Sequence, residues 1–159
     1  MSPRPATLAE APALAAVHAS SFDRPWSAAE IAALLESPGV EALALESDGH
    51  LAAFILVRTV AGEAEILTLA VRPQARRSGL ARALTEAAIR LCASSGAETL
   101  FLEVAADNAP ALGLYVACGF EIAGRRPRYY DRGPAAPAQD ALLMRRALPT
   151  APASPYSMG

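Results

Sequence analysis

The sequence predicts an α/β fold with a mixed central sheet of about six to seven strands, flanked by about four helices. Alternating apolar segments separated by tight turns fill the first half, and a strand–helix–strand unit follows them. Hydrophobic residues make up 53% of the 159 residues, which suffices for one sizeable core. We expect a single domain over residues 1–148 and a disordered tail over 149–159, which has little to pack.

The first segments read as a short strand followed by two helices. Residues 4–8 are the candidate strand, and residues 11–20 have the apolar spacing of a helix. Ser27 and Glu30 have the spacing of a capping box, in which each side chain satisfies a backbone N–H of the other residue. A second helix therefore starts there, and it should end near Gly39.

Three consecutive strands follow. Residues 40–47 and 50–60 flank Asp48–Gly49, a pair that favours a two-residue hairpin turn because both turn positions need positive φ. Residues 65–71 form the next apolar strand. Short turns between successive strands predict an antiparallel meander.

The pattern then changes to a helical period. An apolar stripe runs from Gly79 to Ser94–Gly96, where the helix should stop, and residues 99–104 form an apolar strand. A strand, a helix and a strand with such short links make a βαβ unit, so the two strands should be parallel with a right-handed crossover.

The last third contains one helix and two strands. Residues 109–118 are predicted helical, with Pro110 tolerated in the first turn. Residues 120–124 and 140–146 are predicted strands, and we assign residues 125–139 to a polar loop rich in proline and arginine.

One turn has the composition of an anion site. Arg76 to Ala81 has the form R-x-x-G-x-A between a strand and a helix. The first N–H groups of a helix lack partners inside it, and Gly79 lets the backbone approach a phosphate closely. The spacing fits neither a P-loop nor a dinucleotide-binding turn. On spacing alone, an ordinary strand-to-helix connection remains open.

Three polar residues lie near the carboxyl end of the neighbouring strand. Glu103 is a carboxylate in an apolar strand, so it is either a general base or a solvent-facing strand end. Asn108 can cap the next helix and offer its amide to a ligand. Tyr115 lies seven residues later, on the same helix face as Asn108, and it belongs either to the site or to the core.

The remaining distinctive side chains have ordinary interpretations. Trp26 lies in a loop, as a cap on the core or as a wall of a substrate groove. Cys92 and Cys118 are expected to be buried small hydrophobic residues without a disulfide. His18 and His50 are far apart in sequence without a ligand spacing, so we expect no metal.

Charge and hydropathy exclude several classes of protein. The net charge is −2 and all 14 basic residues are arginines, so a general nucleic-acid binder is not expected. The first residues lack the pattern of a signal peptide, and no apolar run approaches the roughly 20 residues of a membrane span. We expect a cytoplasmic protein without membrane or direct nucleic-acid contacts, either a monomer or a weak dimer.

Together these motifs resemble the GNAT acetyltransferases over nearly the whole chain up to about Leu148, and the RimI branch, which acetylates the N-termini of ribosomal proteins, in particular. The resemblance rests on the R-x-x-G-x-A turn and on the run from Leu102 to Phe120. It rests also on Pro25-Trp26-Ser27, Arg125-Arg126…Tyr129-Tyr130 and Asp140.

The resemblance implies acetyl-CoA as co-substrate, no metal, and a GNAT fold. It implies Glu103 as the base and Tyr115 as the acid. The implied cofactor contacts are Leu69, Ala70, Val71, Arg76, Arg77, Ser78, Gly79, Leu80, Ala81, Arg82 and Asn108, and the implied substrate contacts are Trp26, Tyr129 and Tyr130.

The implied function is transfer of an acetyl group from acetyl-CoA to the N-terminal α-amino group of a protein, with a ribosomal protein bearing N-terminal alanine as the implied partner. Two alternatives remain: the same chemistry on a small amine or a lysine side chain, and a non-catalytic acyl-CoA-binding module. The sequence departs from the family at Arg76, where glutamine is common, and at Ala81, where glycine is common. The insert 133–139 lies where substrate would dock.

Overall fold

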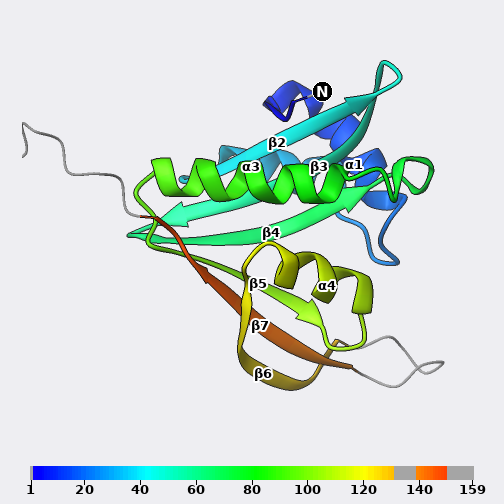
Figure 1. Cartoon of the computed structure of the whole chain (residues 1–159). Helices are drawn as coiled ribbons and strands as arrows, with labels where there is room; N and C mark the ends of the chain where they lie inside the picture. Colours follow the sequence, from blue (N-terminus) through cyan, green and yellow to red (C-terminus); the bar gives the residue numbers. More distant parts are fainter. Residues whose placement is uncertain (1, 131–138, 150–159) are drawn as a thin grey trace, which may run out of the picture.

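A computed structural model describes residues 2–130 and 139–149 of the chain. Its core is one seven-stranded sheet in the order β1-β2-β3-β4-β5-β7-β6, with helices on both faces (Figure 1). The strands are β1 Arg4–Pro5, β2 Val40–Ser47, β3 His50–Val60, β4 Glu63–Val71, β5 Thr99–Ala105, β6 Glu121–Tyr130 and β7 Gln139–Ala147. The α-helices are α1 Ala11–Ala19, α2 Ala28–Glu36, α3 Leu80–Ser94 and α4 Ala109–Ala117, and short 3-10 turns span Leu8–Glu10 and Pro73–Ala75.

The first half of the chain folds as its pattern predicts. Ser27 Oγ accepts from the Glu30 N–H at 3.1 Å, and Glu30 Oε1 accepts from the Ser27 N–H at 3.2 Å, which is the complete capping box. Asp48 and Gly49 have φ of 54° and 78°, as the two-residue hairpin turn requires. The strand predicted over 4–8 is shorter, because only Arg4 and Pro5 pair with β2.

The prediction of a loop over 125–139 is wrong for its first part, because β6 continues to Tyr130. Pairing with β7 carries the strand onward, with Arg125 opposite Leu142 and Arg126 opposite Ala141. β6 is the edge of the sheet, where charged side chains and a proline are tolerated. Residues 131–138, which hold most of the predicted substrate-docking insert, lie outside the described residues.

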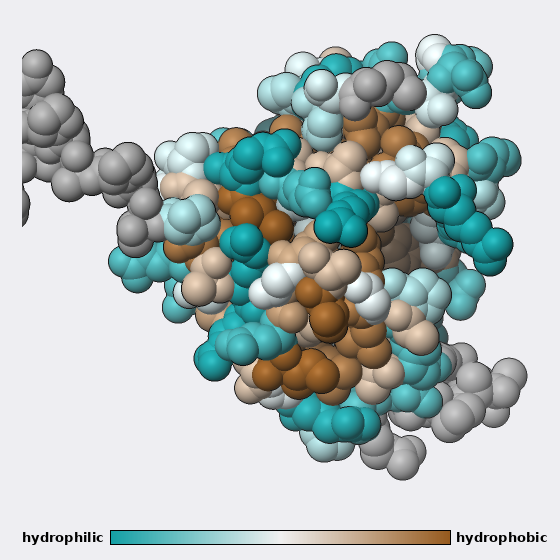
Figure 2. All heavy atoms as spheres, viewed as in Figure 1, coloured by the Kyte–Doolittle hydropathy of each residue, from teal (hydrophilic) through white to brown (hydrophobic). Residues whose placement is uncertain are grey.

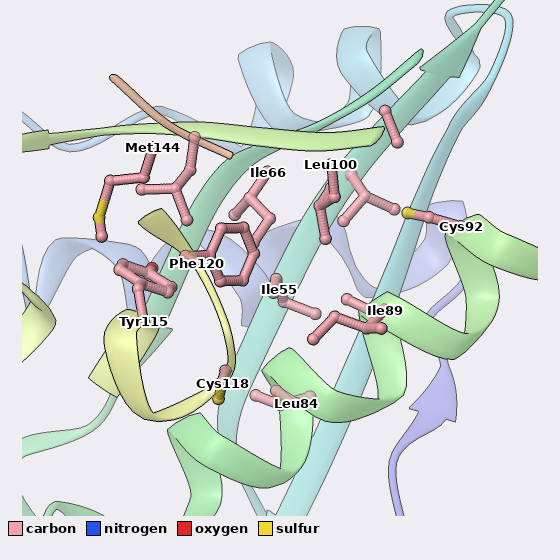
Figure 3. Close-up of a cluster of buried hydrophobic side chains, with 14 of the residues drawn as sticks. Ile55, Ile66, Leu84, Ile89, Cys92, Leu100, Tyr115, Cys118, Phe120 and Met144 are labelled. Atoms are coloured by element: carbon pink, nitrogen blue, oxygen red, sulfur yellow. The ribbon is translucent and has the colours of Figure 1, made fainter. Parts of the chain in front are cut away.

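Two apolar clusters lie on opposite faces of the sheet. One lies under α3 and α4 and contains Leu84, Leu102, Tyr115 and Phe120 (Figure 3). The other lies under α1 and α2 and contains the buried residues Leu14, Val17, Ile31, Phe54 and Ala70. Cys92 and Cys118 are buried free thiols of the first cluster, as expected. In Figure 1, α3 and α4 lie in front of the sheet and α1 lies behind it.

Gly39 and Gly49 offer a matched test of the fold. Both have φ of +78°, but a Cβ on Gly39 would lie directly against the carbonyl oxygen of Thr59, whereas nothing lies within 4 Å of one on Gly49. Both Ala variants carry the left-handed strain of about 1–2 kcal/mol. In urea unfolding, we expect Gly39→Ala to lower the free energy of unfolding by roughly 1–3 kcal/mol more than Gly49→Ala does. Equal losses would contradict the close approach of Gly39 to β3.

Candidate active site

The two parallel strands at the centre of the sheet separate along their length. β4 and β5 pair only at Glu63–Thr99, Ala64–Leu100 and Glu65–Phe101. Beyond this point β4 continues to Val71 beside β3, and β5 continues to Ala105 beside β7 (Figure 1). The separation begins at a bulge, because Leu67 is an extra residue between the pairs Val57–Ile66 and Leu56–Thr68. β4 and β5 are therefore unpaired with each other beyond Glu65 and Phe101, which leaves a gap between them.

The backbone of β4 has polar groups that face this gap. The Arg72 N–H donates to the Ala52 carbonyl at 2.8 Å, so the alternate residues Ala70 and Thr68 also direct their backbone groups to β3. Leu69 and Val71 therefore direct theirs to the open side. Ser21 Oγ donates to the Val71 carbonyl at 2.9 Å, which satisfies one of these groups.

The turn from β4 to α3 presents further unpartnered N–H groups. Arg77 and Gly79 have φ of 64° and 80°, and Gly79 is the N-cap of α3. In the described part of the chain, no carbonyl or side chain accepts from the N–H groups of Ser78 to Arg82. Nothing lies within 4 Å of a Cβ built on Gly79, so the space in front of the turn is open. This turn fits an anionic group well.

Two side chains of the turn have partners within the protein. Arg82 Nε donates to Glu86 at 3.0 Å on the surface of α3, so its side chain is already engaged there. Ser78 Oγ donates to the Ala75 carbonyl and tightens the turn. In Figure 2, apolar surface lies among the polar side chains over α3 and continues below them around α4.

Asn108 caps α4, as predicted. Its Oδ1 accepts from the Ala111 N–H at 3.2 Å, so its Nδ2 amide is the group that can donate to a ligand. Tyr115 is 7% exposed and its ring meets Phe120 edge-on at 5.6 Å between centroids (Figure 3). The ring therefore belongs to the core under α4, and this burial is compatible with a role for its hydroxyl group.

Glu103 lies on the opposite face of β5. Leu102 and Val104 belong to the cluster under α3 and α4, and alternation along the strand directs Glu103 to the other face. Its side chain is 23% exposed, and its Oε1 accepts from Arg126 at 2.8 Å. Glu103 is thus a partly buried carboxylate, and its ion-pair partner is Arg126.

Arg126 was missed as a site residue because residues 125–139 were assigned to a loop. Its guanidinium carbon lies 4.9 Å from the centroid of the Tyr129 ring, a cation–π distance, and it reaches across β7 to β5. The sequence did contain a signal for it, because two adjacent arginines on an edge strand direct one side chain to each face of the sheet. Tyr129 is half exposed, and the side chain of Tyr130 is outside the described residues.

Trp26 packs at the edge of the cluster under α1 and α2 and stacks on His18. The His18 ring lies between Phe22 and Trp26, with centroid distances of 4.3 and 4.9 Å. The backbone N–H of Trp26 donates to His18 Nδ1 at 3.1 Å, and His18 Nε2 lies 3.2 Å from Thr68 Oγ1. Sequence reasoning missed His18 because its partners are distant or irregularly spaced in the chain.

A separate hollow of about 340 Å³ lies between the β2–β3 hairpin and the end of β4. It is lined by His50, Arg72 and Gln74 among others, and Arg72 Nε donates to the Leu51 carbonyl at 2.7 Å. None of the predicted site residues lines it. This hollow is therefore not the site that the sequence predicts.

Two further features of the described residues bear on other classes of function. No group of three or more His, Cys, Asp or Glu side chains among them could hold a metal ion. No helix in the described ranges is long and apolar enough to cross a membrane.

Comparison with known proteins agrees with the fold. Residues 11–120 match the model of the acetyltransferase (GNAT) family. The chain belongs to the GNAT acetyltransferase family. A Bacillus subtilis (strain 168) protein, provisionally named a ribosomal protein bS18-alanine N-acetyltransferase, is 38% identical over 130 residues, which are 80% of this chain and 83% of that protein. The Escherichia coli (strain K12) enzyme of that name is 40% identical over 100 residues, 63% of this chain and 66% of that protein.

Solved structures lead to the same family. The crystal structure of the Escherichia coli ribosomal-protein-S18-alanine N-acetyltransferase has a TM-score of 0.87 at 31% identity, over 98% of this chain and 99% of that one. Ard1 from Thermoplasma volcanium has a TM-score of 0.79 at 25% identity, over 92% and 97%. The RimI-like resemblance of the sequence is therefore confirmed, and the protein is an acetyl-CoA-dependent N-acetyltransferase.

The burial of His18 gives a prediction for stability against pH. Burial lowers the pKa of His18 from its ordinary value of 6.5, and the charge of Glu30 opposes this in part. The unfolded chain then takes up a proton before the folded one, so this stabilisation is full above about pH 6.5 and declines as the pH falls towards the folded-state pKa. Between about pH 7 and 5, we expect the free energy of unfolding in urea to fall more steeply for the wild type than for His18→Asn. Identical pH dependence of the two proteins would contradict a buried neutral His18.

Proposed function

We propose that this acetyltransferase acetylates the N-terminal α-amino group of a protein, and that the protein is a ribosomal protein with an N-terminal alanine. The observation that carries the proposal is Glu103, a partly buried carboxylate on β5 beyond the point where β4 and β5 separate. The activity in the names of the bacterial relatives supports the choice of substrate class.

The unpartnered groups of β4 and α3 support a site for acetyl-CoA. We assign the N–H groups of Ser78 to Arg82 to its pyrophosphate, the open-side backbone of Leu69 to Val71 to its pantetheine arm, and the Asn108 amide to a further contact. Arg76 and Arg77 add positive charge at the turn. Bound there, acetyl-CoA supplies the acetyl group as a reactive thioester.

The proposed base and the proposed acid belong to opposite faces of the sheet. Glu103 points to the face that α1 and α2 cover, and Tyr115 belongs to the cluster under α4. In this proposal the amine approaches from the side of Glu103, and the sulfur leaves on the side of Tyr115. Trp26 and Tyr129 then form walls for the first residues of the substrate.

The proton transfers follow from ordinary pKa values. A peptide α-amino group has a pKa of about 8 and a lysine side chain about 10.4, so an N-terminus needs little help to lose its proton at neutral pH. Glu103 Oε1 is engaged by Arg126, so Oε2 is the atom that takes the proton, directly or through a water. A phenol in water has a pKa of about 10, and in this proposal the Tyr115 hydroxyl protonates the leaving thiolate.

Cys118 does not fit a covalent route. Burial raises the pKa of its thiol, so the nucleophilic thiolate is disfavoured. Direct attack by the amine, with both reactants positioned across the gap, needs no acyl-enzyme.

The proposal is tested by incubating the protein with acetyl-CoA and peptides that differ only in their first residue. Mass spectrometry should find one acetyl group on the α-amine, with alanine among the preferred first residues. A peptide whose α-amine is blocked and which carries an internal lysine is the matched control. Acetylation of the lysine peptide alone would overturn the proposal.

Variants test the roles of the two catalytic candidates. We expect Glu103→Gln to lower turnover about 100-fold near pH 7, with a smaller loss above about pH 8, where the α-amine has already lost its proton. Tyr115→Phe should lower turnover about tenfold and leave the KM for acetyl-CoA unchanged.

Glu121→Gln is the matched control, since Glu121 is also a β-strand glutamate paired with an arginine, Arg145, at 3.2 Å. It lies on the exposed surface and should keep the wild-type rate. If the variants at Glu103 and Tyr115 also keep wild-type rates, the assignment of base and acid is wrong.

A further inference from the structure

His18 is a titratable side chain that is almost fully buried and has no part in the proposed chemistry. It is 3% exposed and is held on four sides. The rings of Phe22 and Trp26 lie on its two faces, with interplanar angles of 21° and 11°. The Trp26 N–H and Thr68 Oγ1 lie at its two nitrogens.

These contacts fix the tautomer of the ring. A backbone N–H can only donate, so Nδ1, which faces the Trp26 N–H at 3.1 Å, is the unprotonated acceptor. The proton of the neutral ring is then on Nε2, which donates to Thr68 Oγ1 at 3.2 Å. A second proton would place two donors against each other at Nδ1.

One hydrogen-bond partner of His18 lies in the proposed substrate wall, and the other lies in β4, the strand that borders the gap. Trp26 is in the α1–α2 connection, which the proposed function makes a wall for the substrate. Thr68 follows the bulge of β4 and precedes Leu69, whose backbone faces the gap. The ring of His18, together with the Ser21–Val71 hydrogen bond, therefore joins the wall to the strand that borders the gap.

We propose that His18 is a positioning residue, which in its Nε2-protonated neutral form fixes the Phe22–Trp26 segment against the β4 bulge and so sets where the substrate's first residues lie. That this segment contacts the substrate rests on the proposed function. That His18 holds the segment against β4 does not depend on it.

The charged groups around His18 are few. Glu30 of α2 is the carboxylate that acts on its charge, and it favours the protonated form, whereas burial lowers the pKa and favours the neutral form. The other neighbouring groups are uncharged: Phe22 just after α1, Phe54 of β3 and Thr68 of β4. Neutral His18 is thus the form that the surroundings support at neutral pH.

Two substitutions separate the hydrogen bonds from the packing. In His18→Asn the side-chain oxygen can take the place of Nδ1 and accept from the Trp26 N–H. In His18→Phe an aromatic ring remains for stacking, but both hydrogen bonds are lost. We expect His18→Phe to raise the KM for the peptide roughly tenfold with little change in kcat or in the KM for acetyl-CoA, and His18→Asn to recover most of this loss.

Val17→Ala is the matched control for stability. Val17 is fully buried in the same helix, and truncating it should lower the unfolding temperature without changing the KM for the peptide. If His18→Phe also leaves this KM unchanged while Trp26→Ala raises it, His18 only fills the core and the proposal is overturned, while the proposed function stands.

A measurement on the free protein does not depend on activity. Trp26 is the only tryptophan of the chain, so its fluorescence reports on the stacked ring beside it. As the pH falls below about 6.5, we expect the emission of the wild type to change while the protein remains folded, and that of His18→Asn to stay constant.

The outcomes distinguish the two proposals. Failure of the wild type to acetylate any peptide α-amine would defeat the proposed function and leave the fluorescence change as support for the positioning of the segment. A pH-independent Trp26 emission in the folded wild type, or the same change in His18→Asn, would overturn the role of His18 even if peptides are acetylated.

Discussion

The site depends on the loss of pairing between β4 and β5 after Glu65 and Phe101. Parallel strands in the middle of a sheet normally satisfy each other's backbone groups along their whole length. Here the bulge at Leu67 turns β4 away, and its last residues hold backbone polar groups towards a gap. A ligand with its own amide groups can complete this edge as a neighbouring strand would, which is the property that a pantetheine arm offers.

The same separation connects the two faces of the sheet. On one face, the start of α3 and the cap of α4 present N–H and amide groups around Gly79 and Asn108. On the other face, Glu103 is paired with Arg126, and the backbone N–H of Trp26 donates to the neutral ring of His18. In the proposed function, acetyl-CoA and the amine enter from opposite sides and meet between the strands, where the sheet aligns them.

Local patterns predicted most of the elements, because capping, turn and periodicity signals operate within a few residues. The box at Ser27–Glu30, the turn at Asp48–Gly49 and the cap at Asn108 are all confirmed. The extension of β6 was missed because only pairing with β7 makes residues 125–130 a strand. Arg126 and His18 were missed for a related reason, since their partners Glu103 and Thr68 are distant in sequence and come near only in the assembled sheet.

Amide hydrogen exchange with and without coenzyme A tests most directly whether the open edge of β4 and the start of α3 form the cofactor site. The account predicts slower exchange on binding in Leu69 and Val71 and in Ser78 to Arg82, with no change in the β2–β3 hairpin around Asp48. Protection confined to that hairpin and to the hollow beside Arg72, with unchanged exchange at β4 and α3, would contradict it.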